Sequence, residues 1–186
     1  MKPRFLIPLG VFFGLVVVLA VGINHSRDVG VLKSPLVGHE IPDWELPVLT
    51  DPSKTLGSRE LKGQWYVLNY WGAWCYACRV EHPTLLAAQR EARVQIIGVD
   101  WVADNPDENA AALDLLARMG NPYRQVVVDR DGRTAIDLGV AAAPESFLVN
   151  PQGVIVYKEP GIITPESWQR EFLSRLPPAP AHAGGS

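Results

Sequence analysis

Two cysteines separated by two residues, Cys75 and Cys78, are the side chains whose type and spacing most clearly suggest chemistry. They follow an apolar run of strand length, Tyr66–Tyr70, and open a stretch with a helical pattern. At a helix start, unpaired N–H groups and the helix dipole stabilise a thiolate, the attacking species in disulfide exchange. We therefore expect Cys75 to be the accessible, acidic nucleophile. Cys78, one helical turn further on, is expected to be the shielded thiol that resolves the reaction by closing a disulfide.

A cysteine pair can also bind a metal, attach haem or staple a fold. Zinc needs two more ligands, and His82 lies at helical distance from Cys78, but no other histidine has paired-ligand spacing. We expect His82 to lie on the helix surface instead. Covalent haem attachment requires a histidine directly after the second cysteine, and Arg79 occupies that position. Zinc and a structural disulfide remain open, although so small a loop restricts the unfolded chain little.

Strands and helices alternate around the motif, which predicts an α/β fold with a sheet covered on both faces. The sequence Asn150–Gly153 should close a hairpin. Helices are expected to begin at Asn105, which Pro106 follows, and at Thr164, because both residues can cap a helix. The expected strands are Tyr66–Tyr70, Val94–Asp100, Gln125–Val128, Ser146–Val149 and Val154–Lys158.

The first 23 residues are predicted to be a signal anchor. Phe5–Ile23 carries no charged side chain and follows Lys2 and Arg4. As a helix this stretch would be roughly 28 Å long, close to the hydrocarbon thickness of a bilayer. The positive flank predicts a single-pass protein of the inner membrane whose C-terminal domain lies in the periplasm. A cleaved signal peptide is the alternative, because residues 20–22 form a small-x-small triplet.

The rest of the chain is expected to contain one domain. A polar tether (residues 24–36) precedes the globular part (37–176), and a low-complexity tail (177–186), expected to be disordered, follows it. The chain has 186 residues and a formal net charge of −3, and it contains no basic run or basic–aromatic stripe. These features argue against a nucleic-acid partner.

Five segments, in this order, carry a resemblance to a known family: residues 41–47, 68–71, 78–83, 120–123 and 139–149. Trp-Cys-x-x-Cys after a strand resembles the thioredoxin superfamily. The flanking segments resemble its membrane-anchored branch, the thiol:disulfide interchange proteins of cytochrome c maturation (DsbE/CcmG type). The resemblance covers most of residues 37–176. It implies a thioredoxin-like α/β fold, with a central mixed β-sheet flanked by helices and an N-terminal transmembrane anchor. It also implies a redox-active Cys75–Cys78 disulfide with no other cofactor.

The resemblance implies a groove for a bound peptide beside the cysteines. Pro144 should be a cis-proline that faces them, and Ala143 before it should lend its backbone to the peptide. Trp74 and Trp71 should form an apolar wall, although Trp71 could belong to the core alone.

Two acids are expected near this groove. Asn69 stands where thioredoxin itself has a buried aspartate, and it cannot take a proton. The resemblance implies instead that Glu81 is partly buried near the thiols, with a raised pKa that lets it accept the Cys78 proton. The alternative is a solvated Glu81 paired with Arg79 or a later base. Glu145 is the second expected acid.

With the anchor, the resemblance implies a periplasmic reductant in cytochrome c biogenesis. It would keep cysteines of an apocytochrome, or of a carrier thiol protein, reduced for haem attachment. A membrane thiol reductase would be the electron donor, because the periplasm is oxidising. Tyr76 departs from the proline common in the family, so the redox potential is not carried over. General or copper-site thiol:disulfide exchange remains an alternative, as does a soft-metal chaperone, although Met1 and Met119 are the only methionines.

Overall fold

The computed structural model describes residues 10–20, 34–101 and 107–178. The chain divides into two units, residues 1–33 and 34–186. In the first unit, residues 10–20 form a helix. Within the described ranges, no helix is both long enough and apolar enough to cross a bilayer. The expected anchor and tether extend into residues 1–9 and 21–33, which lie outside those ranges, as do residues 179–186 of the tail. These predictions therefore stay predictions.

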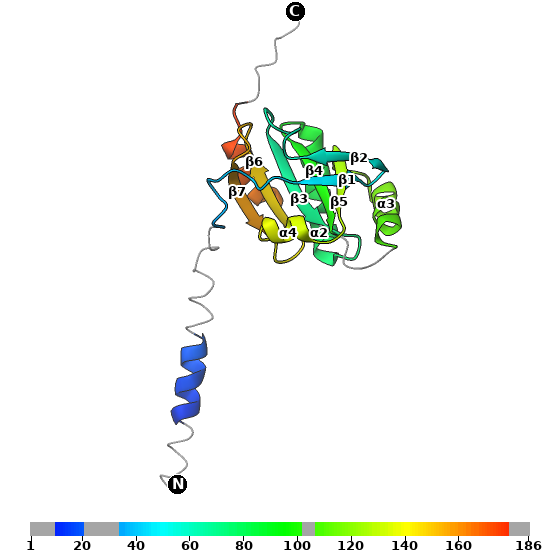
Figure 1. Cartoon of the computed structure of the whole chain (residues 1–186). Coiled ribbons are helices and arrows are strands. Elements are labelled where there is room, and N and C mark those ends of the chain that lie inside the picture. The colour runs from blue at the N-terminus through cyan, green and yellow to red at the C-terminus, as the bar shows by residue number, and fades with distance from the viewer. Residues whose placement is uncertain (1–9, 21–33, 102–106, 179–186) are drawn as a thin grey trace, which may run out of the picture. The chain divides into compact units, whose positions relative to one another are not determined.

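The second unit is built on one mixed sheet. Its strands are β1 (Glu45–Val48), β2 (Asp51–Gly57), β3 (Tyr66–Trp71), β4 (Gln95–Trp101), β5 (Gln125–Asp129), β6 (Glu145–Val149) and β7 (Ile155–Pro160). Their order is β2-β1-β5-β4-β3-β6-β7 (Figure 1). The central strands β3, β4 and β5 pair in parallel, and every other pairing among these strands is antiparallel. The mixed sheet expected from the family resemblance is confirmed.

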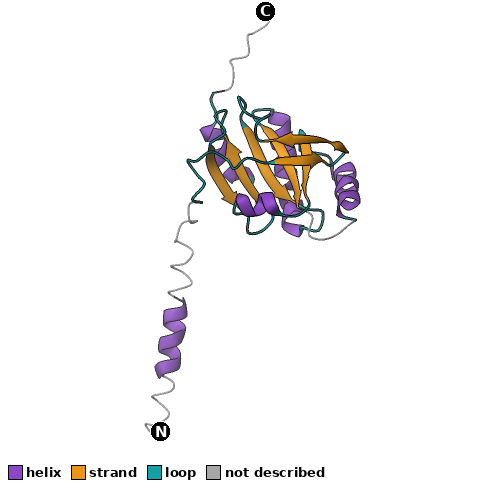
Figure 2. Ribbon diagram, in the orientation of Figure 1, coloured by secondary structure: helices purple, strands orange, loops and turns teal. Residues whose placement is uncertain are grey.

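Helices cover both faces of this sheet, as Figure 2 shows. They are α2 (Tyr76–Glu91), α3 (Glu108–Met119), α4 (Arg133–Asp137) and α5 (Pro165–Ser167), which continues as a π-helical turn (Trp168–Phe172) and a 3₁₀ turn (Leu173–Arg175). One core lies between the sheet and α2, α3 and the C-terminal helical segment. The other lies beneath α4 and the chain before β1. β3 has all six residues buried, as expected of a central strand covered on both faces.

The five expected strands are all present, with ends shifted by one or two residues. The expected hairpin joins β6 and β7, and the Asn150 side chain accepts hydrogen bonds from two backbone N–H groups in its turn. Thr164 caps α5 in a reciprocal capping box with Ser167. The expected helix start at Asn105 and Pro106 lies outside the described residues, and α3 is described from Glu108. The sequence reasoning missed β1, β2 and α4.

Candidate active site

The cysteine pair lies where the chain leaves β3 and enters α2. Cys75 has an extended backbone (φ −83°, ψ 110°) and is the N-cap of α2, and its sulfur accepts a hydrogen bond from the Cys78 N–H at 3.1 Å. The two sulfurs form a disulfide. Backbone N–H groups at a helix start favour negative charge, so this position stabilises a thiolate on Cys75 once the bond is reduced.

The expected difference in exposure between the two cysteines is not found. In the disulfide form the relative exposures of the two residues are 4% for Cys75 and 5% for Cys78, so both cysteines are buried to a similar extent. Sequence reasoning placed Cys78 deeper because it is one turn further into the helix. Cys75 is also buried, and the Ala143 carbonyl lies against its sulfur. Their different roles in the reaction stay predictions.

The segment before β6 faces the disulfide. The Ala143–Pro144 peptide bond is cis, as expected. The Ala143 carbonyl oxygen lies 3.5 Å from Cys75 Sγ. The structure therefore brings the predicted backbone site and the expected nucleophile together. A peptide in an extended conformation could pair with this stretch of backbone while its sulfur faces Cys75.

The two tryptophans before the cysteines have different environments. Trp74 is 47% exposed, its indole N–H donates to the Trp101 carbonyl at 3.1 Å, and its ring meets the Trp101 ring edge to face. Trp71 is buried and stacks on Tyr123, with ring centroids 5.3 Å apart. The Trp71 and Tyr123 rings both lie against Gly98, where an added Cβ atom would come within 3 Å of each ring. Trp74 is thus available as a wall of the expected peptide groove, and Trp71 belongs to the core.

Glu81 is a buried residue of α2, three residues after Cys78. One carboxylate oxygen accepts a hydrogen bond from the Asn69 amide and the other from the Ile163 backbone N–H, both at 2.9 Å. Burial raises the pKa of Glu81 to about 7, although both hydrogen bonds lower it. Residues three apart on a helix lie on neighbouring parts of its surface. The expectation of a buried acid with a raised pKa is confirmed, and the solvated alternative is wrong.

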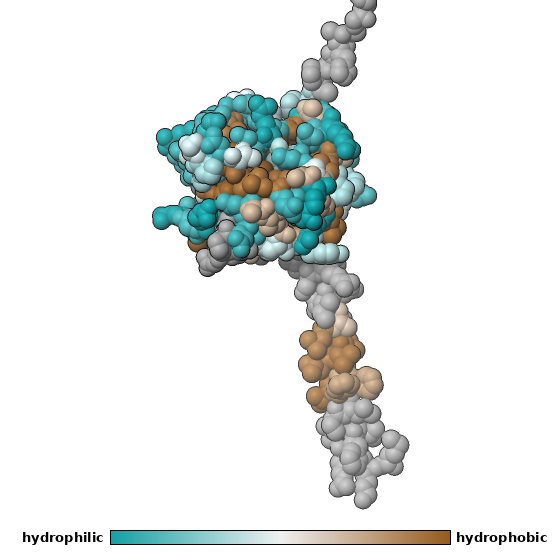
Figure 3. Space-filling model, turned by 90° about the vertical axis from the view of Figure 1, so that its right-hand side faces the viewer, coloured by the Kyte–Doolittle hydropathy of each residue, from teal (hydrophilic) through white to brown (hydrophobic). Residues whose placement is uncertain are grey.

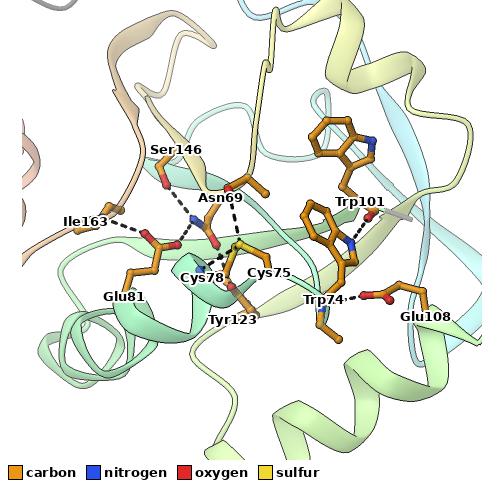
Figure 4. The surroundings of a disulfide bond; sticks show 12 residues. Asn69, Trp74, Cys75, Cys78, Glu81, Trp101, Glu108, Tyr123, Ser146 and Ile163 are labelled. Carbon is orange, nitrogen blue, oxygen red and sulfur yellow. Dashed lines mark hydrogen bonds between the residues drawn. A yellow bond between two sulfur atoms is a disulfide. The ribbon is translucent and has the colours of Figure 1, made fainter. Parts of the chain in front are cut away.

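Asn69 connects Glu81 to two further polar groups that the sequence reasoning did not assign to the site. Its amide also donates to the Ser146 hydroxyl at 2.9 Å, and its carbonyl accepts from the Tyr123 hydroxyl at 2.8 Å. All four side chains are buried. Tyr123 lies in one of the segments that carry the family resemblance, and this was the only indication in the sequence that Tyr123 could belong to the site. The network fixes the Asn69 amide so that its N–H groups face Glu81 and Ser146 (Figure 4).

Glu145 is buried, and its charge is paired. Its carboxylate pairs with Lys158 at 2.8 Å and accepts from the Ala141 backbone N–H at 3.3 Å. Lys158 also donates to the Gly139 carbonyl at 2.8 Å. The pair therefore connects β6 and β7 to residues 139–141, directly before the cis bond. Glu145 holds this segment, and peptide binding through Glu145 itself stays a prediction.

The expected position of His82 on the helix surface is wrong. The side chain is buried, and its Nε2 lies 2.9 Å from the Gly120 carbonyl oxygen. A carbonyl oxygen only accepts, so this nitrogen carries a proton and donates. The contact ties α2 to the end of α3. Within the described ranges, no group of three or more histidine, cysteine, aspartate or glutamate side chains is placed to hold a metal ion.

The thioredoxin-like fold, the capped cysteine pair and the facing cis-proline define a thiol:disulfide oxidoreductase of the thioredoxin superfamily. The Redoxin family model matches residues 36–171. The thiol:disulfide interchange proteins DsbE of Allochromatium vinosum and Pseudomonas aeruginosa are 40% and 39% identical, over 91% and 92% of this chain and 90% and 91% of their own lengths. A DsbE-type structure from Chlorobium tepidum is 25% identical, with a TM-score of 0.61 over 73% of this chain and 94% of that one. The chain therefore belongs to the DsbE-type thiol:disulfide interchange proteins of the Redoxin family.

Proposed function

We propose that this protein is a reductant in cytochrome c biogenesis, acting in the periplasm while residues 5–23 hold it in the inner membrane. Its partners are the haem-binding cysteines of an apocytochrome c or the thiols of a carrier protein. A membrane thiol reductase returns the Cys75–Cys78 disulfide to the dithiol, because the compartment itself is oxidising. The observation that carries the exchange chemistry is the Ala143 carbonyl 3.5 Å from the sulfur of the helix-capping Cys75. The segments that resemble cytochrome c maturation proteins support the choice of partner.

The reaction begins with an attack on the partner's disulfide. The Cys75 thiolate forms a bond to one partner sulfur, and the other leaves as a thiolate that takes a proton from solvent. The Ala143 backbone holds the partner's chain beside Cys75 during this step. The product is a mixed disulfide between Cys75 and the partner.

Cys78 then releases the partner. Its thiol gives a proton to the Glu81 carboxylate, whose pKa of about 7 lets it accept a proton near neutral pH. The resulting thiolate attacks Cys75 Sγ, and the second partner sulfur leaves. Two electrons have passed to the partner, and the disulfide between Cys75 and Cys78 is closed, as the structure has it. Glu81 returns its proton to solvent or to the departing thiolate.

A trapping experiment tests the proposed partner. The full chain with Cys78→Ala cannot resolve the mixed disulfide, so we expect it to retain an apocytochrome c or a carrier thiol protein covalently. The matched Cys75→Ala variant should retain far less. Cells that lack the protein should lose haem-attached cytochromes c, and an added small thiol should partly restore them. Normal cytochromes c in such cells, together with defective disulfide formation in secreted proteins, would show an oxidant instead.

A further inference from the structure

A second buried acid lies on the other side of the cysteine motif from Glu81. Glu108 is the first residue of α3, and its Oε1 accepts a hydrogen bond of 2.6 Å from the Ala73 backbone N–H. Figure 4 shows this carboxylate reaching from its helix to the backbone next to Trp74. Ala73 lies two residues before Cys75, and the intervening turn is closed by a bond from the Cys75 N–H to the Gly72 carbonyl. The contact therefore acts on the chain that sets the position of Cys75.

The same corner contains further fixed groups. Trp74 is held by its bond to the Trp101 carbonyl, at the end of β4. Asp100, the residue before Trp101, is buried, and neither of its carboxyl oxygens has a hydrogen-bond partner among the described residues. The charged groups that act on Asp100 are Glu108 from α3 and Arg130 after β5. Burial and the Glu108 charge raise the pKa of Asp100 to about 7.

A carboxylate in this position has two effects on Cys75. As an acceptor for the Ala73 N–H, it holds the turn before the sulfur in one conformation. As a negative charge on the order of 10 Å from that sulfur along the chain, it opposes the stabilisation of the thiolate by the start of α2.

We propose that Glu108 is a positioning residue of the exchange reaction: its buried carboxylate fastens the chain just before Cys75 and places a negative charge near the attacking sulfur. The proposal rests on the exchange chemistry and not on the identity of the partner. It is therefore tested with purified protein and a disulfide-containing peptide, and it can fail while the proposed function stands.

Two variants separate the charge from the hydrogen bond. Glu108→Gln keeps an oxygen that accepts from the Ala73 N–H but removes the charge, whereas Glu108→Ala removes both. The control is Asp114→Asn on the same helix, where the acid is 61% exposed and paired with Arg118. The pKa of Cys75 is measured from the pH dependence of alkylation, in a Cys78→Ala background for every variant. Reduction of the peptide is followed as kcat and KM with Cys78 present.

We expect Glu108→Gln to lower the Cys75 pKa by about 0.5 unit, with kcat/KM within about twofold of the parent's. Glu108→Ala should show the same pKa change and a loss of about fivefold or more in kcat/KM. Asp114→Asn should change neither. An unchanged Cys75 pKa in Glu108→Gln overturns the proposal, even if Glu108→Ala fails to fold. Equal kcat/KM in the folded Gln and Ala variants overturns the positioning role.

Discussion

At the residue scale, Glu81 is the group whose protonation state controls the second half of the proposed reaction. Its pKa of about 7 leaves a substantial ionised fraction near neutral pH, and in the proposed mechanism the Cys78 thiol on the same helix is the proton donor. Glutamine cannot accept that proton. We expect Glu81→Gln to slow resolution of the mixed disulfide by roughly 10- to 100-fold at pH 7–8.

Rapid chemical quench of the mixed disulfide with a model peptide measures this rate. In the parent protein the rate should rise with pH through about 7, following ionisation of Glu81. The variant should lose that inflection. The control is Glu91→Gln at the other end of α2, where the acid is exposed. A parent-like rate and pH profile in Glu81→Gln would exclude Glu81 as the proton acceptor.

The raised pKa of Asp100 can be tested separately, through the pH dependence of the free energy of unfolding. Burial and Glu108 raise its pKa to about 7, from an ordinary value of 3.8. The folded state thus holds this proton more tightly than the unfolded state, so ionisation costs stability as the pH rises from about 4 through 7. Asp100→Asn removes that cost. We expect the variant to be more stable than the parent at pH 8 by about 1–3 kcal/mol, and to lose this advantage at pH 4.

Urea unfolding at both pH values measures the difference, with Asp114→Asn as the exposed control. The same difference at pH 4 and pH 8 would show that Asp100 does not titrate in this interval.

At the element scale, the β6–β7 hairpin holds the segment before the cis bond through the Lys158–Glu145 pair. The two side chains are 11% and 8% exposed. Lys158→Met would leave a buried carboxylate without its countercharge and release the Gly139 carbonyl. We expect a loss of about 3 kcal/mol in the free energy of unfolding, from the uncompensated charge. We also expect a rise in KM for a disulfide peptide, because residues 139–143 are held less firmly.

The matched control is Lys62→Met, which breaks an exposed pair with Glu40 and should cost about 0–1 kcal/mol. Chemical denaturation and steady-state kinetics measure the two effects. A Lys158→Met variant as stable as Lys62→Met, with an unchanged KM, would show that the pair neither stabilises the hairpin nor positions the segment.

Elements with a strong local pattern were predictable, and those without one were not. The central strands are continuous apolar runs, because they are buried on both faces. By contrast, β2 is an edge strand, Asp51–Gly57, that is mostly exposed and carries no alternation. α4 has five residues, too few to show a helical period. His82 was misplaced because a packing partner from the end of α3, Gly120, decides which side of α2 is covered.

The site likewise divides into residues that a local sequence pattern locates and residues that only contacts between distant segments bring together. Cys75, Cys78 and Glu81 lie within seven residues, so the motif locates the two cysteines, and the family resemblance together with helical spacing locates Glu81. Asn69, Tyr123 and Ser146 meet only through the sheet, across 54 and 77 positions of the chain. Glu108 reaches Ala73 across 35 positions. Side-chain chemistry alone gives no indication of such contacts, because they depend on strand order and register.

At the scale of the whole molecule, the face of the domain in Figure 3 has an apolar band between hydrophilic regions. Two large aromatic side chains next to the disulfide, Trp74 and Tyr76, are among the exposed residues. Exposed aromatic side chains on both sides of a buried cysteine favour partners that dock as a chain, because a small thiol has too little surface to pack against them.

Retention of the predicted anchor would confine this chemistry to the membrane surface. Phe5–Ile23 is apolar throughout and follows Lys2 and Arg4, which predicts a retained, uncleaved span. We expect the full chain to sediment with inner membranes, to resist extraction by high salt and alkaline carbonate, and to enter solution in mild detergent. A protease added to the periplasmic side should reach the domain. The intact mass should include residues 1–23, as a retained anchor requires. A soluble periplasmic protein that has lost about 20 N-terminal residues would establish the cleaved signal peptide instead, and the membrane thiol reductase would then have to reduce a diffusing partner.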